Sequence, residues 1–508
     1  MMDQRAESAG TPDRVLASNE EIRRDLGRKA VEGGALVAAA RLYGIALRIV
    51  ALSVLGNLLS PEDFGVVALA AVVGDFAAVL RDFGLATAVI QREKLEPRQL
   101  SNLFWIGVVA TLAATAVVAG AGPVLEAMYG RPELVAVCLV SSLSILISGT
   151  AQVPSALLQR RMANRQIAMG QVIAATVSFA IAVAFAVLGA GYWALVAQSV
   201  VNAAVVAALL WKQARWLPTR WQAGVDVKPL LRVSGGSAAS HLSVYVARNA
   251  DNAVVGKVTD LAQLGLYTRA YQFVLIPEQL AAPVSAVAMP ALARLQDDPE
   301  RFRHFFRRAI GLLTLVTMPV VAAMAALAHL VFPALMGPNW NEAVPIFRML
   351  AVGSFVMTLG PCTAWVLSAT GRTDRQWRIN AVFSGTLLLS FVAGAPWGAI
   401  GVAAASSVAS LLGRAVAIPL SFRGTPVRTS DLVDAVWRNA TVAILAGVVA
   451  FVASGVGWFP TQVHVALLVG CLVYTLAWFA LWVVVPGGVA QLRGIVADAR
   501  ALRRGRLD

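Results

Sequence analysis

The sequence predicts an all-α polytopic membrane protein with about fourteen transmembrane helices. Hydrophobic residues make up 58% of the 508 residues, charged residues make up only 14%, and the mean hydropathy is +0.70. A soluble protein could not cover so much apolar surface with polar side chains. Apolar stretches long enough to cross about 30 Å of hydrocarbon also recur along the whole chain. These observations exclude a secreted protein, a cytosolic enzyme and a disordered regulator.

Fourteen apolar stretches have the length of a transmembrane helix. The first, second, seventh and eighth stretches carry charged residues, which makes them the least apolar of the set. The predicted spans are 33–58, 62–91, 101–122, 131–158, 164–188, 191–212, 230–257, 262–293, 308–332, 342–369, 377–395, 397–421, 433–456 and 463–485. The connections between them are short, so no soluble catalytic module is expected.

The basic residues predict how these spans are oriented. Most of the 42 lysines and arginines fall in the two tails and in every second connection, whereas the opposite connections hold only Arg131 and Lys257. Basic connections stay in the cytoplasm, so we expect an even number of spans with both termini inside. Twelve spans would fit nearly as well without the last pair, but 433–456 and 463–485 have the composition of spans. The net charge of +14 therefore indicates topology and not nucleic-acid binding.

The spans are expected to form two repeated lobes. Gly33-Gly34 and Gly235-Gly236 begin comparable segments, and residues 64–70 match 264–270, although chance matching of apolar spans is an alternative. Six spans per copy predict a pseudo-twofold axis along the membrane normal and a cavity between the lobes. The expected parts are a cytoplasmic tail (1–32), an N-lobe (33–212), a cytoplasmic linker (213–229), a C-lobe (230–421), an extra span pair (422–485) and a basic cytoplasmic tail (486–508).

Polar and ionisable side chains inside the spans are the candidate substrate-binding residues. Such groups are costly in hydrocarbon and usually face a cavity, and here they concentrate in the first, second, seventh and eighth spans. The candidates are Arg41, Arg48, Asp75, Arg81, Asp82, Tyr245, Arg248, Asp251, Asn252, Arg269 and Gln272. Pro277 interrupts the eighth span and is the candidate hinge, with a static kink as the alternative.

These residue types indicate a path for an anionic, hydrogen-bonding solute. Arginine forks match phosphate oxygens, and carboxylate, amide and tyrosine groups suit sugar hydroxyls. The alternative is that ion pairs such as Arg248 with Asp251 only hold helices together. Arg269 could also extend toward the membrane surface, and His241 could serve either proton coupling or helix packing.

The sequence contains no motif for catalysis or for a cofactor. No glycine loop followed by Lys-Ser/Thr is present, and no zinc-ligand spacing occurs. Cys138, Cys362 and Cys471 lie in apolar runs and are expected to be small hydrophobic side chains. The first 32 residues lack the apolar segment of a cleavable signal peptide. We therefore expect no enzyme, metal or cofactor, and leave coupling to an H⁺ or Na⁺ gradient open.

Several motifs in these spans resemble bacterial polysaccharide flippases. In the first lobe they are Leu59-Ser-Pro-Glu-Asp-Phe-Gly65, Arg81-Asp-Phe-Gly-Leu85 and Ala88-Val-Ile-Gln-Arg92. In the second lobe they are Asn249-Ala-Asp-Asn252, Leu264-Gly-Leu-Tyr-Thr-Arg-Ala-Tyr271 and Pro290-Ala-Leu-Ala-Arg-Leu295. The similarity covers about 30–425 and is specific to the O-antigen and exopolysaccharide branch of the multidrug/oligosaccharidyl-lipid/polysaccharide exporter superfamily.

The resemblance implies an alternating-access flippase in the bacterial inner membrane. Such proteins move undecaprenyl-pyrophosphate-linked oligosaccharide repeat units from the inner to the outer leaflet for exopolysaccharide, O-antigen or capsule biosynthesis. The implied partners are the lipid-linked oligosaccharide, membrane lipids and the polysaccharide polymerase or export machinery, without nucleic acid. Alternatives are a peptidoglycan-precursor flippase, a drug/cation antiporter, for which the arginine excess is unsuitable, and a membrane polysaccharide polymerase, which needs a sizeable outer loop.

Overall fold

The computed structural model describes residues 39–40, 42–82, 89–90, 96–223, 249–456 and 459–488. All regular elements in these ranges are helices, which confirms the predicted all-α class. The chain divides into two compact units, Met1–Asn249 and Ala250–Asp508. The division falls inside the predicted seventh span, of which the described part, 249–258, is helical. The predicted pseudo-twofold relation between the units stays a prediction.

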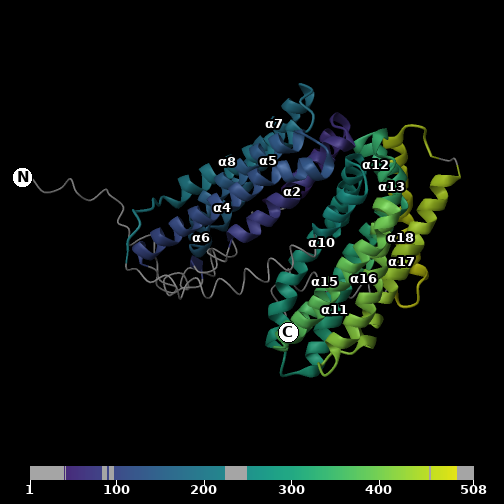
Figure 1. Cartoon of the computed structure of the whole chain (residues 1–508). Helices are drawn as coiled ribbons and strands as arrows, with labels where there is room; N and C mark the ends of the chain where they lie inside the picture. The colour runs from purple at the N-terminus through teal and green to yellow at the C-terminus, as the bar shows by residue number, and fades with distance from the viewer. Residues whose placement is uncertain are drawn as a thin grey trace, which may run out of the picture. The chain divides into compact units, whose positions relative to one another are not determined.

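The described residues of the first unit form seven helices of at least nine residues each (Figure 1). They are Leu42–Leu58, α2 (Pro61–Asp82), α4 (Pro97–Tyr129), α5 (Glu133–Thr150), α6 (Gln152–Arg160), α7 (Asn164–Val187) and α8 (Trp193–Ala214). Helix α4 begins where the sequence supplies a capping box between Glu96 and Gln99, with Pro97 at the first helical position. It ends at Gly130, whose φ of 67° is a left-handed conformation that glycine adopts without strain.

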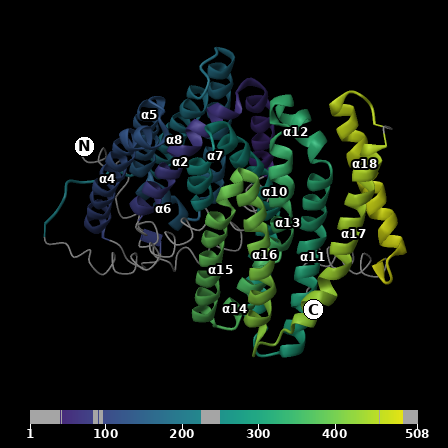
Figure 2. The same cartoon turned by 45° about the vertical axis from the view of Figure 1, so that its right-hand side comes forward.

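The second unit holds the remaining helices (Figures 1 and 2). They are α10 (Leu261–Arg294), α11 (Pro299–Ala326), α12 (Ala328–Met336), α13 (Ala343–Met357), α14 (Gly360–Ala369), α15 (Thr373–Gly394), α16 (Gly398–Phe422), α17 (Thr429–Gly455) and α18 (Val463–Val484), with short 3-10 helices η2 (Pro338–Trp340) and η3 (Ala395–Trp397). The Asp260 side chain caps α10 by accepting a hydrogen bond from the Gln263 N–H at 2.7 Å.

Ten segments among the described residues are long and apolar enough to cross a membrane. One of them, Thr373–Phe422, comprises the two helices α15 and α16, which η3 separates. The charged α2 and the shorter helix Leu42–Leu58 lie at the predicted second and first spans but are not among the ten. The chain is therefore a multi-pass membrane protein, and the described residues of the predicted spans are largely helical.

Three of the predicted spans are each divided into two helices; the span predicted over 308–332 includes the end of α11 and the start of α12, which meet at Leu327. The span predicted over 131–158 consists of α5 and α6, which meet at Ala151. The span predicted over 342–369 consists of α13 and α14, and α14 begins with Gly360-Pro361. Proline has no N–H to donate, so it is tolerated in the first turn of a helix but not in the interior.

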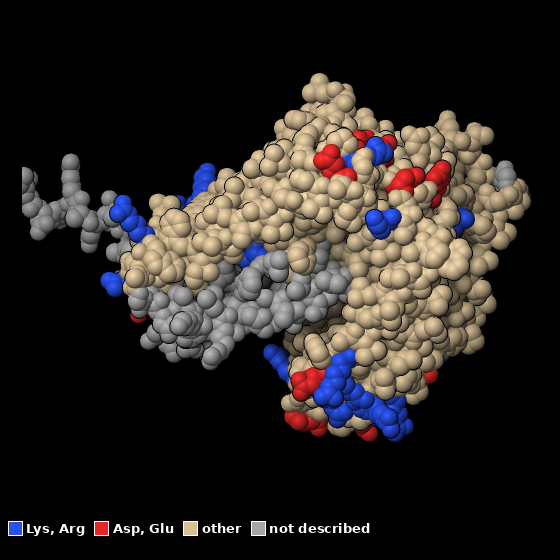
Figure 3. All heavy atoms as spheres, viewed as in Figure 1, with Lys and Arg blue, Asp and Glu red and all other residues tan. Residues whose placement is uncertain are grey.

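The basic segment 300–308 is helical, but it is not a separate surface helix. It forms the first turns of α11, which therefore begins before the predicted span 308–332. Asp298 caps this helix by accepting from the N–H groups of Glu300 and Arg301 at 3.2 and 3.1 Å. Phe302 and Phe306 are fully buried, so the segment is fixed by an apolar face. Figure 3 shows the arginines gathered at the end of the second unit where α11 begins, beside a wide uncharged surface.

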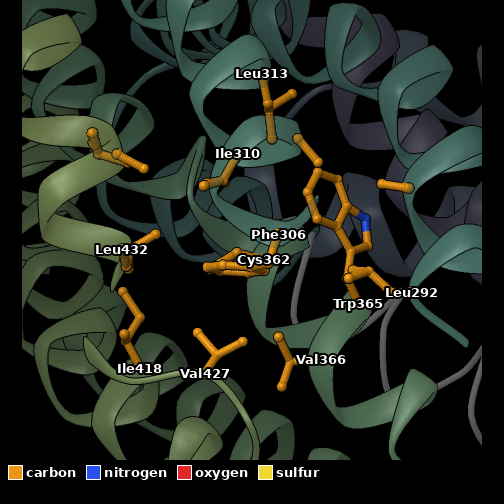
Figure 4. Packing of buried hydrophobic residues seen from close by; sticks show 14 of the residues in the cluster. Leu292, Phe306, Ile310, Leu313, Cys362, Trp365, Val366, Ile418, Val427 and Leu432 are labelled. Carbon is orange, nitrogen blue, oxygen red and sulfur yellow. The ribbon is translucent and has the colours of Figure 1, made fainter. Parts of the chain in front are cut away.

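The core of the second unit lies between α10, α11, α14, α16 and α17. Figure 4 shows Phe306, Ile310 and Leu313 of α11 near Trp365 of α14 and Leu432 of α17. The C-terminal pair α17 and α18 is thus part of this unit.

Buried hydrogen bonds add to the contact between α17 and α11. Asn439 Nδ2 of α17 donates to Gly311 O at 2.9 Å and to Thr314 Oγ1 at 2.8 Å, both on α11. At the end of the same contact, the Asp431 carboxylate pairs with Arg307 and Arg303.

In the first unit, side chains at the start of α4 hold the segment that follows α8. Asn102 donates to Gln222 O at 2.8 Å and accepts from Gln222 N at 3.0 Å, an arrangement we call the amide clamp. Ser101 Oγ accepts from the N–H of Thr219 at 3.1 Å, and Trp105 Nε1 donates to Thr219 O at 2.9 Å. The clamp fixes Gln222, close to the end of the described range 96–223.

Candidate functional site

Two of the predicted site residues in the first unit have side chains that are free of partners among the described residues. Arg48 lies on the helix Leu42–Leu58 and Asp75 lies on α2, and both side chains are exposed in this unit. Neither makes a hydrogen bond or an ion pair within the described ranges. A charge inside a predicted span without such a partner is available to a ligand.

Arg81 has a different environment, because it is buried between α2 and α5. Its Nη1 donates to Ile145 O at 3.1 Å and to Ser148 Oγ at 2.7 Å. Both acceptors lie in the last turns of α5, just before the break at Ala151. The carbonyl end of a helix carries partial negative charge, so it suits a guanidinium. Arg81 thus ties α2 to the end of α5.

The second unit contains a buried carboxylate, Asp251, that is only 2% exposed. Its Oδ2 accepts from the Tyr267 hydroxyl of α10 at 3.0 Å, and its Oδ1 accepts from the Asn252 N–H at 2.8 Å. Tyr267 is fully buried and stacks on Tyr271 with ring centroids 6.4 Å apart. The Asn252 side-chain oxygen is also buried and has no hydrogen-bond partner within the described part of the chain.

Arg269 and Gln272 come together on α10. Arg269 Nη1 donates to Gln272 Oε1 at 2.5 Å, one turn along the helix. Pro277 is buried within α10, which continues as one helix through Pro277, Pro283 and Pro290. The missing proline N–H weakens the helix there, and the hinge role of Pro277 stays a prediction.

Four predicted site residues are beyond what the structure describes. Arg41, Tyr245 and Arg248 lie outside the described residues, and the Asp82 side chain is also outside them, although its backbone ends α2. The expected pair between Arg248 and Asp251 therefore remains a prediction.

Sequence reasoning missed one charged side chain inside the second unit. Arg414 is not among the predicted site residues, although it lies within α16, about two turns before the helix ends at Phe422. Its position inside the predicted span 397–421 was the signal that could have identified it. Glu278 of α10 acts on it electrostatically.

The described residues offer little for catalysis. They contain no group of three His, Cys, Asp or Glu side chains that could hold a metal ion. All three cysteines are free; Cys138 and Cys362 are buried as expected, whereas Cys471 is exposed on α18. The available chemistry is the binding of anionic and hydroxyl groups by arginine, carboxylate and amide side chains.

Comparison with known proteins places these features in a family. The family model described as "Polysaccharide biosynthesis protein" matches residues 54–345. The succinoglycan biosynthesis transport protein ExoT of Rhizobium meliloti (strain 1021) is 29% identical over 322 residues, which are 63% of this chain and 65% of that protein. The match therefore spans just under two thirds of ExoT.

Two further relatives have similar coverage. The lipopolysaccharide biosynthesis protein WzxC of Escherichia coli (strain K12) is 25% identical over 385 residues, 74% of this chain and 77% of that protein. The teichuronic acid biosynthesis protein TuaB of Bacillus subtilis (strain 168) is 26% identical over 347 residues, 68% of this chain and 71% of that protein.

Solved structures share the fold at low sequence identity. The lipid II flippase MurJ in an inward closed conformation is 15% identical with a TM-score of 0.67, covering 88% of this chain and 98% of MurJ. A MATE transporter of Vibrio cholerae, VcmN, is 14% identical with a TM-score of 0.53, covering 79% and 98%. The chain thus belongs to the polysaccharide biosynthesis protein family and has the helical fold of the MurJ and MATE transporters.

Proposed function

We propose that this protein is a flippase for lipid-linked oligosaccharides. It would move undecaprenyl-pyrophosphate-linked repeat units from the inner to the outer leaflet of the bacterial inner membrane during polysaccharide biosynthesis. The family assignment supports this proposal, and the relative ExoT is named as a transport protein. The three relatives are named for succinoglycan, lipopolysaccharide and teichuronic acid, so the proposed substrate class is the precursor of a surface polysaccharide.

The observation that carries the proposal is the presence of arginines inside helices of both units. Arg48 lies in the first unit and Arg269 lies in the second, each within a predicted span. A sugar-pyrophosphate headgroup is large, polar and negatively charged, so it cannot cross hydrocarbon unaided. Guanidinium groups bind pyrophosphate oxygens through paired, charge-assisted hydrogen bonds.

The candidate residues divide into three roles under this proposal. Arg41, Arg48 and Arg248 contact pyrophosphate or acidic sugars, with Arg269 oriented by Gln272. Asp75, Asp82, Tyr245 and Asn252 contact sugar hydroxyls. Arg81 and Asp251 are fixed by partners inside their own units, so they act mainly by positioning helices.

Location and partners follow from the same proposal. Both termini lie in the cytoplasm, as the distribution of basic residues indicates. The lipid tail stays in the bilayer while the headgroup crosses, and a polymerase or export complex consumes the product. An H⁺ or Na⁺ gradient, or removal of the product, supplies the driving force.

A deletion strain tests the proposal. Lipid-linked oligosaccharides are extracted from cells lacking the gene, and their leaflet is determined with a membrane-impermeant sugar-modifying reagent. Complete repeat units trapped on the cytoplasmic face, and released when the gene is restored, support flipping. Units that reach the outer face but remain unpolymerised indicate a polymerase role instead.

The fold similarity to MurJ favours one second candidate, a flippase for the peptidoglycan precursor. Rescue of cell-wall synthesis in cells depleted of their own lipid II flippase would favour this candidate. Failure to rescue, together with restored polysaccharide export in the deletion strain, supports the oligosaccharide substrate.

A further inference from the structure

The Arg414 side chain packs against the break between α13 and α14. It lies on the buried side of α16, between Ser410 and Ala417, about 12 Å along the helix from the last residue Phe422. A Cβ built on Gly360 would lie 3.0 Å from Arg414 Nη2 and 3.6 Å from Cζ. The guanidinium therefore lies directly against the first residue of α14, where an added methyl group would press on it.

An aromatic ring of α15 supports the same guanidinium. The Arg414 Cζ lies 4.9 Å from the centroid of Phe383, which is the geometry of a cation–π contact. Phe383 reaches α16 at Gly413, where an added Cβ would lie only 2.6 Å from the ring. Three helices thus hold one arginine in place, and two glycines provide the room.

The guanidinium is held without being neutralised by a close partner. Arg414 makes no hydrogen bond and no ion pair within 4 Å among the residues that the structure describes, and its Nε is buried without a partner. Glu278 of α10 is the acidic side chain that acts on it, without an ion pair within 4 Å. Arg414 is half-buried, and burying the Nε donor of a charged group without an acceptor is costly. Such a residue inside a membrane span is usually kept for a ligand.

The contrast with Arg81 supports this interpretation. Both arginines lie near a break in a predicted span, but Arg81 donates to Ile145 O and Ser148 Oγ of α5. The donors of Arg414 have no such acceptors among the described residues. A packing role accounts for Arg81 and leaves the donors of Arg414 unexplained.

We propose that Arg414 is a further substrate-binding residue whose guanidinium holds the pyrophosphate of the transported lipid. The inference rests on the proposed function and extends it to a residue outside the predicted set. The planar guanidinium of Arg414 lies over the Phe383 ring and has no hydrogen-bond acceptor among the described residues. Its paired N–H groups match two phosphate oxygens better than they match a single hydroxyl.

Binding of farnesyl pyrophosphate to the purified full-length protein in lipid nanodiscs tests this inference, measured by titration calorimetry. We expect Arg414→Ala to weaken binding about tenfold or more, because it removes charge-assisted hydrogen bonds. Arg414→Lys is expected to recover part of the affinity, since it keeps the charge but not the fork. Gly360→Ala should also weaken binding although Arg414 is retained, because its methyl group displaces Nη2.

Arg438 provides a matched control. Its Cζ lies 4.9 Å from the Trp437 ring, but its Nε donates to Pro486 O at 3.0 Å. Arg438→Ala should therefore leave the affinity unchanged. Farnesol, which lacks the headgroup, should bind weakly and equally to all variants. Each variant is first shown to elute as a single folded species.

The outcomes separate the inference from the proposed function. Wild-type affinity in both Arg414→Ala and Gly360→Ala overturns the role of Arg414 but leaves the flippase proposal standing. Equal binding of farnesol and farnesyl pyrophosphate to the wild type means that no pyrophosphate site exists, and the inference fails. If, in addition, the deletion strain shows normal translocation, the proposed function fails as well.

Discussion

Replacing Asp431 by alanine is expected to weaken the contact between α17 and α11. The carboxylate is 2% exposed and accepts from the Arg428 backbone N–H at 2.8 Å and from Arg307 Nε at 2.9 Å. Arg303 Nε lies 3.3 Å from Asp431 Oδ2, the oxygen that also accepts from the Arg428 N–H. One buried side chain thus stabilises the start of α17 and connects it to α11.

The magnitude follows from how buried each interaction is. The bond from the Arg428 N–H resembles a helix cap and contributes about 1 kcal/mol. The Arg303 and Arg307 side chains are 35% and 44% exposed, so solvent screens them and each pair contributes about 0.5–1 kcal/mol. The substitution should therefore lower the free energy of unfolding by about 2–3 kcal/mol.

Thermal unfolding of the purified protein in detergent measures this effect. For a unit of about 250 residues, 1 kcal/mol shifts the midpoint by about 2–4 °C, so we expect a fall of about 4–12 °C. Asp434→Ala is the control, because Asp434 is 62% exposed and its carboxylate lies 3.6 Å from Arg307 Nη2. It should shift the midpoint by about 2 °C or less. Equal shifts for both variants would refute the reasoning.

Three further predictions concern other parts of the molecule. Asn439→Ala removes two hydrogen bonds to α11, and since such bonds in membranes contribute on average about 0.6 kcal/mol each, about 1.2 kcal/mol together, the melting midpoint should fall by less than for the aspartate variant. Arg48→Ala and Arg248→Ala should each abolish polymer export at normal protein levels, as measured by immunoblot and polymer assay; normal export by both contradicts their proposed role. Asn102→Ala opens the amide clamp, so trypsin should cleave after Arg220 several-fold faster, and an unchanged rate means that the clamp does not hold this segment.

Most of the fold could be predicted from the sequence because the bilayer imposes a simple requirement. A spanning helix needs a minimum apolar length, and α7, α8, α16 and α18 begin and end within about two residues of the predicted spans. The breaks in the other spans were not predicted, since apolar composition is the same on both sides of a break. Pro361 and Pro154, each in the first turn of the helix that follows a break, were local signals for α14 and α6.

The residue types of the candidate site could be predicted, but their partners could not. An arginine in a span is visible in the sequence, whereas its acceptor lies on another helix. Arg81 meets Ser148, 67 positions later, and this contact depends on how α2 packs against α5. Asp251 meets Tyr267 across a turn between two helices. The importance of Arg414 became visible only when α14 and α15 were seen to surround it.

Translocation by the purified protein is the most direct test of the central claim. The protein is reconstituted into liposomes with lipid-linked oligosaccharide from the deletion strain, and a membrane-impermeant glycosidase reports the fraction of oligosaccharide exposed outside. The account predicts that exposure rises from about half toward completion as molecules cross from the inner leaflet, and that Arg48→Ala liposomes remain at the starting fraction. If the exposed fraction stays unchanged with folded wild-type protein at every ion gradient imposed, the result would contradict the flippase assignment.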